Sequence, residues 1–559
     1  MSRRPQRPLP VDVGLVLAAV ALLLVALLGS ARLRRYDVPA IDLAPSLLPL
    51  YLLFSLTRLT AAYGVAVLLA LAVGQLAARS PLARRFILPI LDVLQSVPIL
   101  GFFPVAVGFF IAIFGGSALG VETAAVFLIF TSMFWNLAFG VYESLITLPE
   151  DLGLAAATLG LRGPLRWSRL VLPAVVPGLL YNSLLSWANG WYFLIASEII
   201  AVGPARYWLP GLGSYLAQAV SRGQHDATVL ALLALAAATV GMHVLVWGPL
   251  EVWADRFRLE EMGDHPRTPR AVRLLSRSRL ARWLARRVVV PLGQQALALA
   301  AAVLDLLGRR GALSAALAGV VGAALLGAGG WRLLRLFLSR PASPELAGIP
   351  IDLAFSFLRV AAGVLLSALV AIPVAEALAR RPRWRNGSLA TIQVLASIPA
   401  TAFFPLIVVL LTWGLGMNAG ALLLALTTMF WYVLFNVLGA ATALPKETQE
   451  AAASLGLRGF VYLRRVFFPA VLPSLVTGCV TAWGAGWNAM ILCEYLEAGG
   501  RTLEVRGIGA TLDRATYVTG DMQVVAASLL AMVALIILVN RLFWDPLYER
   551  AAARYKMGA

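Results

Sequence analysis

Residues 154–177 read LAAATLGLRGPLRWSRLVLPAVVP, and residues 450–473 read EAAASLGLRGFVYLRRVFFPAVLP. The two stretches align without a gap at an offset of 296 residues (450 − 154). Upstream of them the offset is 301, as between Arg58 and Arg359, so the second copy lacks five residues (301 − 296) that we place near 115–122. Chance does not keep so many matches in register, and the chain therefore contains an internal duplication. The offset of 296 also relates the following pairs: Trp187 and Trp483, Trp191 and Trp487, Glu198 and Glu494, Gly211 and Gly507.

The composition indicates a membrane protein. Of the 559 residues, 60% are hydrophobic and only 13% are charged, and the mean hydropathy is +0.82. A soluble globular domain carries about 25% charged residues. Several apolar runs approach the roughly 20 residues that a helix needs to cross the hydrocarbon. We therefore expect an all-α, polytopic membrane protein.

The net charge of +18 does not by itself indicate a nucleic-acid partner. Arginines cluster in short segments between apolar runs, where the positive-inside bias places them, and there is no basic soluble domain to bind nucleic acid. Cys479 and Cys493 match no zinc spacing, and neither do His225, His243 and His265. We expect no nucleic acid and no metal.

Each copy predicts about six spanning helices, which gives about twelve in all. Six helices per copy give both copies the same orientation, so the repeats are parallel and can face each other across a pseudo-twofold axis. We expect a first repeat over 1–254, a basic cytoplasmic linker with an amphipathic helix over 255–310, and a second repeat over 311–559. The predicted helices lie near 11–30 (an uncleaved anchor), 56–78, 87–113, 123–147, 171–200 and 227–249, and near 312–333, 353–379, 389–413, 418–443, 467–495 and 522–544.

The orientation follows from arginines in short loops. One side carries most of them, and we assign that side and both termini to the cytoplasm. Arg32, Arg34 and Arg35 fall on the other side but are outnumbered. The cytoplasmic set is Arg79, Arg84, Arg85, Arg162, Arg166 and Arg169 in the first copy, and Arg380, Arg381, Arg383, Arg385, Arg458, Arg464 and Arg465 in the second.

The repeated loop resembles a known signature. In the second copy, E-A-A at Glu450 is followed six residues later by Gly456 and then by an apolar-x-Pro stretch, which resembles the cytoplasmic loop of permease subunits in binding-protein-dependent ABC importers. Residues 447–455 favour helix, and Gly456 is suited to end it. Ala451, Ala452 and Leu455 are expected to share one face, as are their counterparts in the first copy, Ala155, Ala156 and Leu159.

The resemblance implies that these helices are coupling helices, each inserting into one ATPase subunit. An ordinary interfacial loop is the alternative, which recurrence in both copies disfavours. The first copy departs from the pattern, because Leu154 stands where Glu450 stands in the second. The implied contact residues are Leu154, Ala155, Ala156, Gly160 and Arg162, and Glu450, Ala451, Ala452, Gly456 and Arg458.

Further residues narrow the resemblance. Each copy has W-x3-W, a glutamate seven residues on and then G-[LI]-G, together with S-x2-R at Ser55–Arg58 and Ser356–Arg359. This is similar to the nitrate, sulfonate/taurine and bicarbonate permease group, in a fused, duplicated form. The resemblance implies the type I ABC importer permease fold, a bacterial cytoplasmic (inner) membrane location and a small anion or organic anion as substrate. It also implies two separate ATPase subunits that hold ATP and Mg, an extracytoplasmic substrate-binding protein, and no cofactor in this chain.

Ionisable and polar residues within apolar segments are candidates for the pore or its gates. Arg58 is predicted to pair with Glu198, and Arg359 with Glu494, at similar depth near the outer face; snorkelling at the interface is the alternative. The remaining candidates could equally form hydrogen bonds between helices. They are Asp92, Gln95, Asn136, Asn189, Gln393 and Asn488.

Two other classes of function remain open. The sequence contains no G-x-x-x-x-G-K-[ST] phosphate loop and no nucleophile–base constellation, so we expect a transport pore rather than an enzyme. A duplicated secondary transporter driven by protons or sodium would not need the paired loop and would transport by itself in proteoliposomes. A membrane enzyme is the third class.

Overall fold

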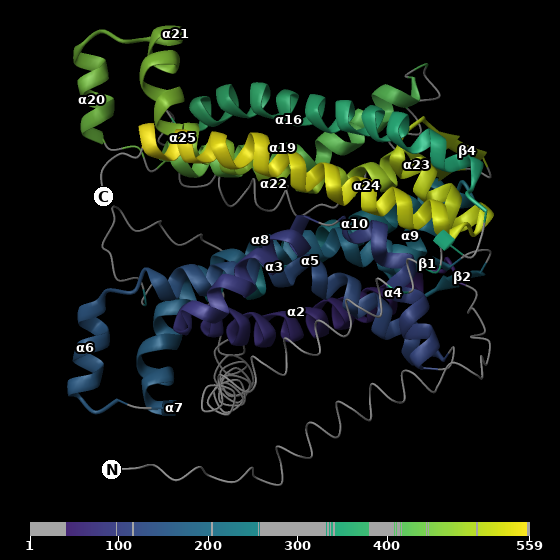
Figure 1. Ribbon diagram of the computed structural model, residues 1–559, viewed down its shortest axis with the longest axis horizontal. Coiled ribbons are helices and arrows are strands. Elements are labelled where there is room, and N and C mark those ends of the chain that lie inside the picture. Colours follow the sequence, from purple (N-terminus) through teal and green to yellow (C-terminus); the bar gives the residue numbers. More distant parts are fainter. Residues whose placement is uncertain are drawn as a thin grey trace.

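The computed structural model describes residues 41–254, 341–379 and 416–555, with short breaks at 97, 115–116, 162, 203–204, 443, 445 and 499–500, and isolated positions at 257, 331, 335, 337, 338, 407, 410 and 414 (Figure 1). The predicted helix 11–30 and the predicted linker 255–310 fall outside these ranges, as do nearly all of 312–333 and 389–413. Within them, eight helices are long and apolar enough to cross a membrane, four in each copy. The protein is therefore an all-α, polytopic membrane protein built from two repeats.

The helices of the two copies correspond one to one where both are described. The first copy contains η2 (Pro45–Leu47), α2 (Leu48–Arg79), α3 (Pro81–Ser96), α4 (Ile99–Ile113), α5 (Ala118–Ile146), α6 (Glu150–Thr158), α7 (Gly163–Arg166), η3 (Trp167–Val171), α8 (Leu172–Glu198), β1 (Ile199–Val202), β2 (Ala205–Trp208), α9 (Leu212–Ser221), α10 (His225–Met242), η4 (His243–Trp247) and α11 (Gly248–Ala254). The second contains η7 (Pro344–Gly348), α16 (Ile349–Ala379), α19 (Met417–Thr442), α20 (Lys446–Ser454), α21 (Gly459–Tyr462), η9 (Leu463–Phe467), α22 (Phe468–Cys493), β3 (Tyr495–Ala498), β4 (Arg501–Glu504), α23 (Ile508–Asp513), η10 (Arg514–Thr519), α24 (Met522–Val539), η11 (Asn540–Trp544) and α25 (Asp545–Tyr555).

The prediction of one spanning helix over 87–113 is wrong. The segment forms two helices, because α3 ends at Ser96 and α4 begins at Ile99. Pro98 lies between them with an extended backbone (φ −61°, ψ 115°). A proline has no N–H to donate to the preceding turn and its ring clashes with that turn, so Pro98 favours a break in the helix at this position.

Two small β-hairpins depart from the expected all-helical pattern. Strand β1 pairs antiparallel with β2 (Ile199 opposite Trp208), and β3 pairs with β4 (Tyr495 opposite Glu504). Each hairpin follows directly on a spanning helix, so α8 and α22 end at Glu198 and Cys493, two residues before the predicted ends at 200 and 495.

Each copy is built around three long helices that pack closely. In the first copy these are α2, α5 and α8, and in the second α16, α19 and α22. Gly190 of α8 leaves room for Met133 of α5, because an added β-carbon would lie 2.0 Å from Met133 Cε. Gly486 meets Met429 in the same way. Small residues at helix contacts allow the close backbone approach on which membrane helix packing depends.

The two copies lie side by side with equivalent ends together (Figure 1). We call one end the loop end, which carries α6 and α7 of the first copy and α20 and α21 of the second. We call the other the hairpin end, which carries β1–β4. The spanning helices α2, α8, α16 and α22 each run from the loop end to the hairpin end (Figure 1). A displacement of one of these helices at the loop end can therefore be transmitted to the hairpin end.

Candidate functional site

The helices at the loop end are short and end in the same way. Helices α6 and α20 have nine residues each, and both stop at a glycine in the left-handed region: Gly160 has φ +69° and Gly456 has φ +70°. In α20 the N–H of Leu457 donates to the carbonyl of Ala452 (3.0 Å), and that of Gly456 donates to Ala453 (3.0 Å). The first copy repeats both bonds. This pair of bonds is a Schellman cap, for which glycine is strongly favoured.

The exposed face of each helix differs from the predicted one. Ala156 and Ala452 are buried, at 4% exposure each, whereas Leu154 is 66% exposed. Leu159 and Leu455 are also exposed, at 76% and 75%. The expectation that both alanines of each pair share a face with the leucine is therefore wrong. The second alanine packs inward, which leaves Ala155 and Ala451 on the outer side with the leucines.

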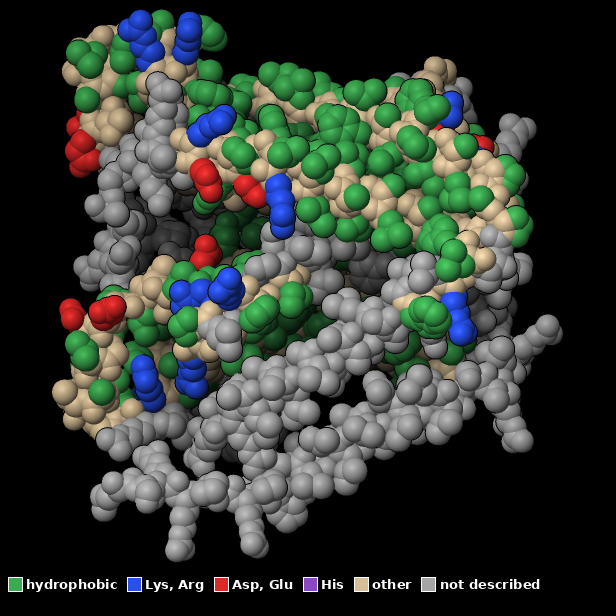
Figure 2. All heavy atoms as spheres, in the orientation of Figure 1, with side chains coloured by type: hydrophobic (Ala, Val, Ile, Leu, Met, Phe, Trp, Pro, Cys, Tyr) green, Lys and Arg blue, Asp and Glu red, His purple; other side chains and the backbone are tan. Residues whose placement is uncertain are grey.

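Charged residues surround these helices. Figure 2 shows acidic and basic side chains gathered at the loop end over both copies. Glu150 and Asp151 lie in the first turn of α6, whereas Glu447 and Glu450 are exposed on α20. Arg458 is exposed just before α21, and Arg162 is not among the described positions. Apolar Leu154 in place of an exposed carboxylate makes the two helices chemically unequal.

At the hairpin end of the first copy, Arg58 joins three elements. Its Nη1 donates to Glu198 Oε1 at the end of α8 (2.9 Å) and to the carbonyl of Pro210 (2.9 Å). Its Nε and Nη2 donate to both carboxylate oxygens of Glu122 on α5 (2.6 Å each). Glu198 is 0% exposed. Its Oε1 also accepts from Ser55 Oγ (2.6 Å), and its Oε2 accepts from the N–H of Gly213 (2.6 Å).

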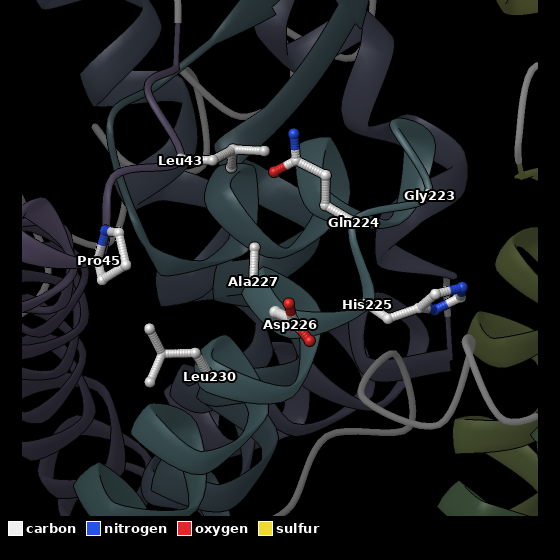
Figure 3. A pocket seen from close by; sticks show the side chains of 8 residues that line it. All are labelled: Leu43, Pro45, Gly223, Gln224, His225, Asp226, Ala227 and Leu230. Atoms are coloured by element: carbon white, nitrogen blue, oxygen red, sulfur yellow. The ribbon is translucent and has the colours of Figure 1, made fainter.

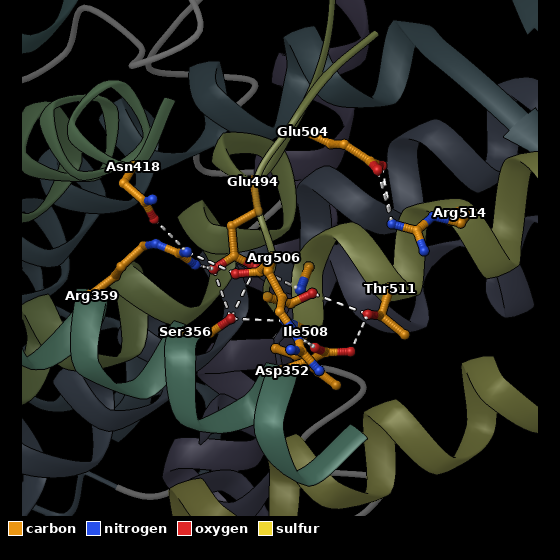
Figure 4. Close-up of polar contacts among 12 residues, drawn as sticks. Asp352, Ser356, Arg359, Asn418, Glu494, Glu504, Arg506, Ile508, Thr511 and Arg514 are labelled. Carbon is orange, nitrogen blue, oxygen red and sulfur yellow. Dashed lines mark hydrogen bonds and ion pairs between the residues drawn. The ribbon is translucent and has the colours of Figure 1, made fainter. Parts of the chain in front are cut away.

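The second copy builds an equivalent cluster from Arg359 and Glu494 (Figure 4). Arg359 Nη1 donates to Glu494 Oε1 (2.5 Å), and Nη2 donates to the carbonyl of Arg506 (2.7 Å). Glu494 also accepts from Ser356 Oγ (2.7 Å) and from the N–H of Gly509 (2.8 Å), and it is 0% exposed. The predicted pairs Arg58–Glu198 and Arg359–Glu494 are confirmed as contacts. Their carboxylates are buried, which excludes snorkelling at the interface.

Sequence reasoning missed the third member of each cluster. Glu122 in the first copy and Asn418 in the second are equivalent (418 − 122 = 296), and Arg359 Nη2 donates to Asn418 Oδ1 (2.8 Å). One arginine is therefore held by two carboxylates and the other by a carboxylate and an amide. The signal available in the sequence was Glu122, an ionisable residue near the start of a predicted spanning helix.

The other polar candidates are placed less uniformly. Asn189 lies on α8 and Asn488 on α22, and each makes a hydrogen bond to the opposite copy. Asn136 is half-buried on α5, and Gln95 is exposed on α3. Asp92 lies on α3, but its side chain is not among the described positions. Gln393 lies outside the described ranges. Within the described part of the chain, no group of three or more His, Cys, Asp or Glu side chains could hold a metal ion.

A cavity of about 510 Å³ opens at the hairpin end of the first copy (Figure 3). Its lining comes from the segment before α2, from the turn before α10 and from the first turns of α10, and includes Gln224, His225 and Asp226. These three residues are exposed. The lining residues belong to one copy, so this cavity is separate from the contact between the two copies.

Comparison with known proteins identifies the repeat. A family model described as "binding-protein-dependent transport system inner membrane component" matches residues 62–247 and again residues 363–544. The nitrate import permease protein of Synechococcus elongatus is 28% identical over 174 residues, which are 31% of this chain and 59% of that protein. A putative aliphatic sulfonates transport permease protein of Escherichia coli is 30% identical over 182 residues, 30% of this chain and 64% of that protein.

A third relative is named for a different class of substrate. The glycine betaine/carnitine/choline transport system permease protein of Bacillus subtilis is 30% identical over 179 residues, 32% of this chain and 76% of that protein.

The chain spans about three fifths of the length of the nitrate and sulfonate permeases that it matches. Because the family model matches the chain twice, over two ranges that make up most of it, the chain belongs to the family of binding-protein-dependent transport system inner membrane components, with two copies of the family's domain in one polypeptide.

Proposed function

We propose that this chain is the transmembrane permease of an ATP-driven, binding-protein-dependent importer, with both halves of the pore in one polypeptide. The observation that carries the proposal is the matched pair of exposed helices, α6 and α20, which end in the same glycine cap at the same end of the molecule. A helix that is fixed by its cap and exposes apolar side chains suits docking into a groove on a soluble partner.

The partners follow from this arrangement. Two ATPase subunits, which hold ATP and Mg, receive α6 and α20 on the cytoplasmic side of a bacterial inner membrane. The arginines near both helices support that orientation, and we propose that both termini lie on the same side. A substrate-binding protein then delivers its ligand at the hairpin end. ATP-driven closure of the ATPase pair moves the two helices relative to each other and reorients the pore.

For the substrate we propose a small anion or organic anion. The printed names of two relatives, for nitrate and for aliphatic sulfonates, support this class. The betaine, carnitine and choline named for the third relative carry a quaternary ammonium group, so they are the comparison compounds for any uptake assay.

The test is capture of the cognate ATPase by the purified chain. Gly160→Val and Gly456→Val place a β-branched residue at φ near +70° and disrupt the caps, so we expect each to weaken capture and the double variant to abolish it. Gly153→Ala is the matched control, because Gly153 lies within α6 and an added β-carbon meets no atom within 4 Å.

Two results would contradict the proposal. Ion-driven uptake by the chain alone in proteoliposomes would favour a secondary transporter. Labelling of a cysteine introduced at Ala155 or Ala451 by an impermeant reagent from outside intact cells would place the loop end on the wrong side of the membrane.

A further inference from the structure

Two hydrogen bonds between described residues of the two copies share one feature: the acceptor in each is an asparagine oxygen. The hydroxyl of Tyr432 on α19 donates to Asn189 Oδ1 on α8 (3.2 Å). The backbone N–H of Ile99, the first residue of α4, donates to Asn488 Oδ1 on α22 (2.6 Å). One bond therefore takes its donor from the second copy and the other takes it from the first.

Both asparagines are oriented by their own copy. Asn189 Nδ2 donates to the carbonyl of Ser132 (3.0 Å), and Asn488 Nδ2 donates to that of Gly484 (3.2 Å). With the amide nitrogen fixed in this way, each Oδ1 faces the other copy. The asparagines act as acceptors that hold a donor of the opposite copy while the copies are in contact.

A third polar group at this interface has no partner. Tyr192 lies one turn beyond Asn189 on α8 and is 6% exposed, and its hydroxyl makes no hydrogen bond. Its side chain lies near Tyr432 and Cys493 of the second copy. Tyr192 occupies the position equivalent to Asn488 (488 − 192 = 296). A buried hydroxyl without a partner is unfavourable, so its presence calls for a state in which it is satisfied.

The electrostatics of these groups favour a negative ligand. Neither bond between the copies involves a charged side chain. The N-terminus of α4, a helix of 15 residues, contributes the partial positive charge of the N–H groups in its first turn. Phenol hydroxyls and helix N-terminal amides are donors that bind anion oxygens without a full positive charge that would retain the anion.

We propose that Tyr192, Tyr432 and the N-terminus of α4 form a subsite for a small oxyanion on the path between the two copies. This inference rests on the proposed function. Asn189 and Asn488 hold two of the donors when the copies are closed, and separation of the copies frees them for the oxygens of the ligand. The counterparts of Tyr192 and Tyr432 are Asn488 and Asn136, so the pseudo-twofold axis does not repeat these two hydroxyl donors.

Tyr192→Phe tests the subsite cleanly, because it removes a hydroxyl that has no bond to lose in the closed structure. The full chain in lipid nanodiscs is titrated with sodium nitrate, and separately with sodium ethanesulfonate, against sodium chloride at equal ionic strength. Intrinsic tryptophan fluorescence reports binding. We expect a saturable response in the natural protein, an affinity about tenfold lower in Tyr192→Phe because a bond to a charged acceptor is lost, and an unchanged melting temperature.

Tyr181→Phe is the matched control. Tyr181 lies on the same helix and contacts Phe435 of the second copy through its ring (centroids 5.9 Å apart), but it lies about three turns towards the loop end. We expect its anion response to equal that of the natural protein.

The inference is overturned by any of three results: no saturable response to either anion, equal affinities for Tyr192→Phe and the natural protein, or a saturable response to choline chloride in their place. ATPase capture, measured on the same preparations, separates the two hypotheses. Loss of capture with intact anion binding would reject the importer hypothesis and support the subsite. Intact capture without anion binding would support the importer hypothesis and reject the subsite.

Discussion

The carboxyl group of Glu198 fills the space beside Gly211: a β-carbon added to Gly211 would lie 2.3 Å from Glu198 Cδ. Gly507 and Glu494 repeat the relationship at the same distance. Gly211 has φ 179° and Gly507 has φ 175°, an extended backbone that any residue can adopt. Glycine is therefore required at these positions for space rather than for conformation, and the G-[LI]-G motif keeps a buried carboxylate in place.

Gly211→Ala is expected to destabilise the first copy. Glu198 cannot move aside, because Ser55, Arg58 and Gly213 all hold its oxygens. Overpacking of this kind costs about 1–3 kcal/mol, which should appear as a lower melting temperature of the purified chain. Gly64→Ala is the control: Gly64 lies within α2 and has no neighbour within 4 Å, so its melting temperature should stay the same or rise. Equal effects of the two substitutions would contradict this account.

Arg58→Met should be among the most damaging single substitutions at the hairpin end. It leaves Glu198, which is 0% exposed, without its cation, and breaking a buried ion pair in this way costs about 3–5 kcal/mol. Adding Glu198→Gln should recover part of that loss, because the second substitution removes the uncompensated charge. The measurement is a double-mutant cycle on unfolding of the purified chain.

Glu122→Gln supplies the contrast for that cycle. The Glu122 side chain is 38% exposed, so water screens its bond to Arg58 and its loss should cost no more than about 1 kcal/mol. Additive effects of Arg58→Met and Glu198→Gln would show that the two side chains do not stabilise each other, whatever their distance.

The parts of the site that sequence reasoning predicted are those that a repeat or a local rule determines. The glycine cap at Gly456 follows from local backbone chemistry. Arg58 and Glu198 are each costly to bury without a partner, so their pairing could be inferred from their similar depth. Pro98 is also a local signal for a break in the helix. The prediction of one helix over 87–113 gave more weight to the apolar residues on both sides of the proline.

The parts that were missed depend on three-dimensional packing. Which of Ala155 and Ala156 faces inward depends on how α6 lies against the bundle, and helical periodicity alone does not fix that angle. The contacts of Asn488 and Tyr432 join residues of different copies, 389 and 243 positions apart in sequence. The sequence around either residue gives no indication of a partner so distant along the chain.

Leu154→Glu should strengthen the contact between the first copy and its ATPase. The substitution restores at the exposed position 154 the carboxylate that Glu450 supplies in the second copy. An exposed ion pair contributes about 0.2–1 kcal/mol, so the affinity measured by capture at low salt should rise by up to about fivefold, and the gain should fall as salt is added. Ala157→Glu adds the same charge at another exposed position of α6 and is the control. A gain that Ala157→Glu reproduces would mean that net charge, rather than position 154, sets the difference between the two helices.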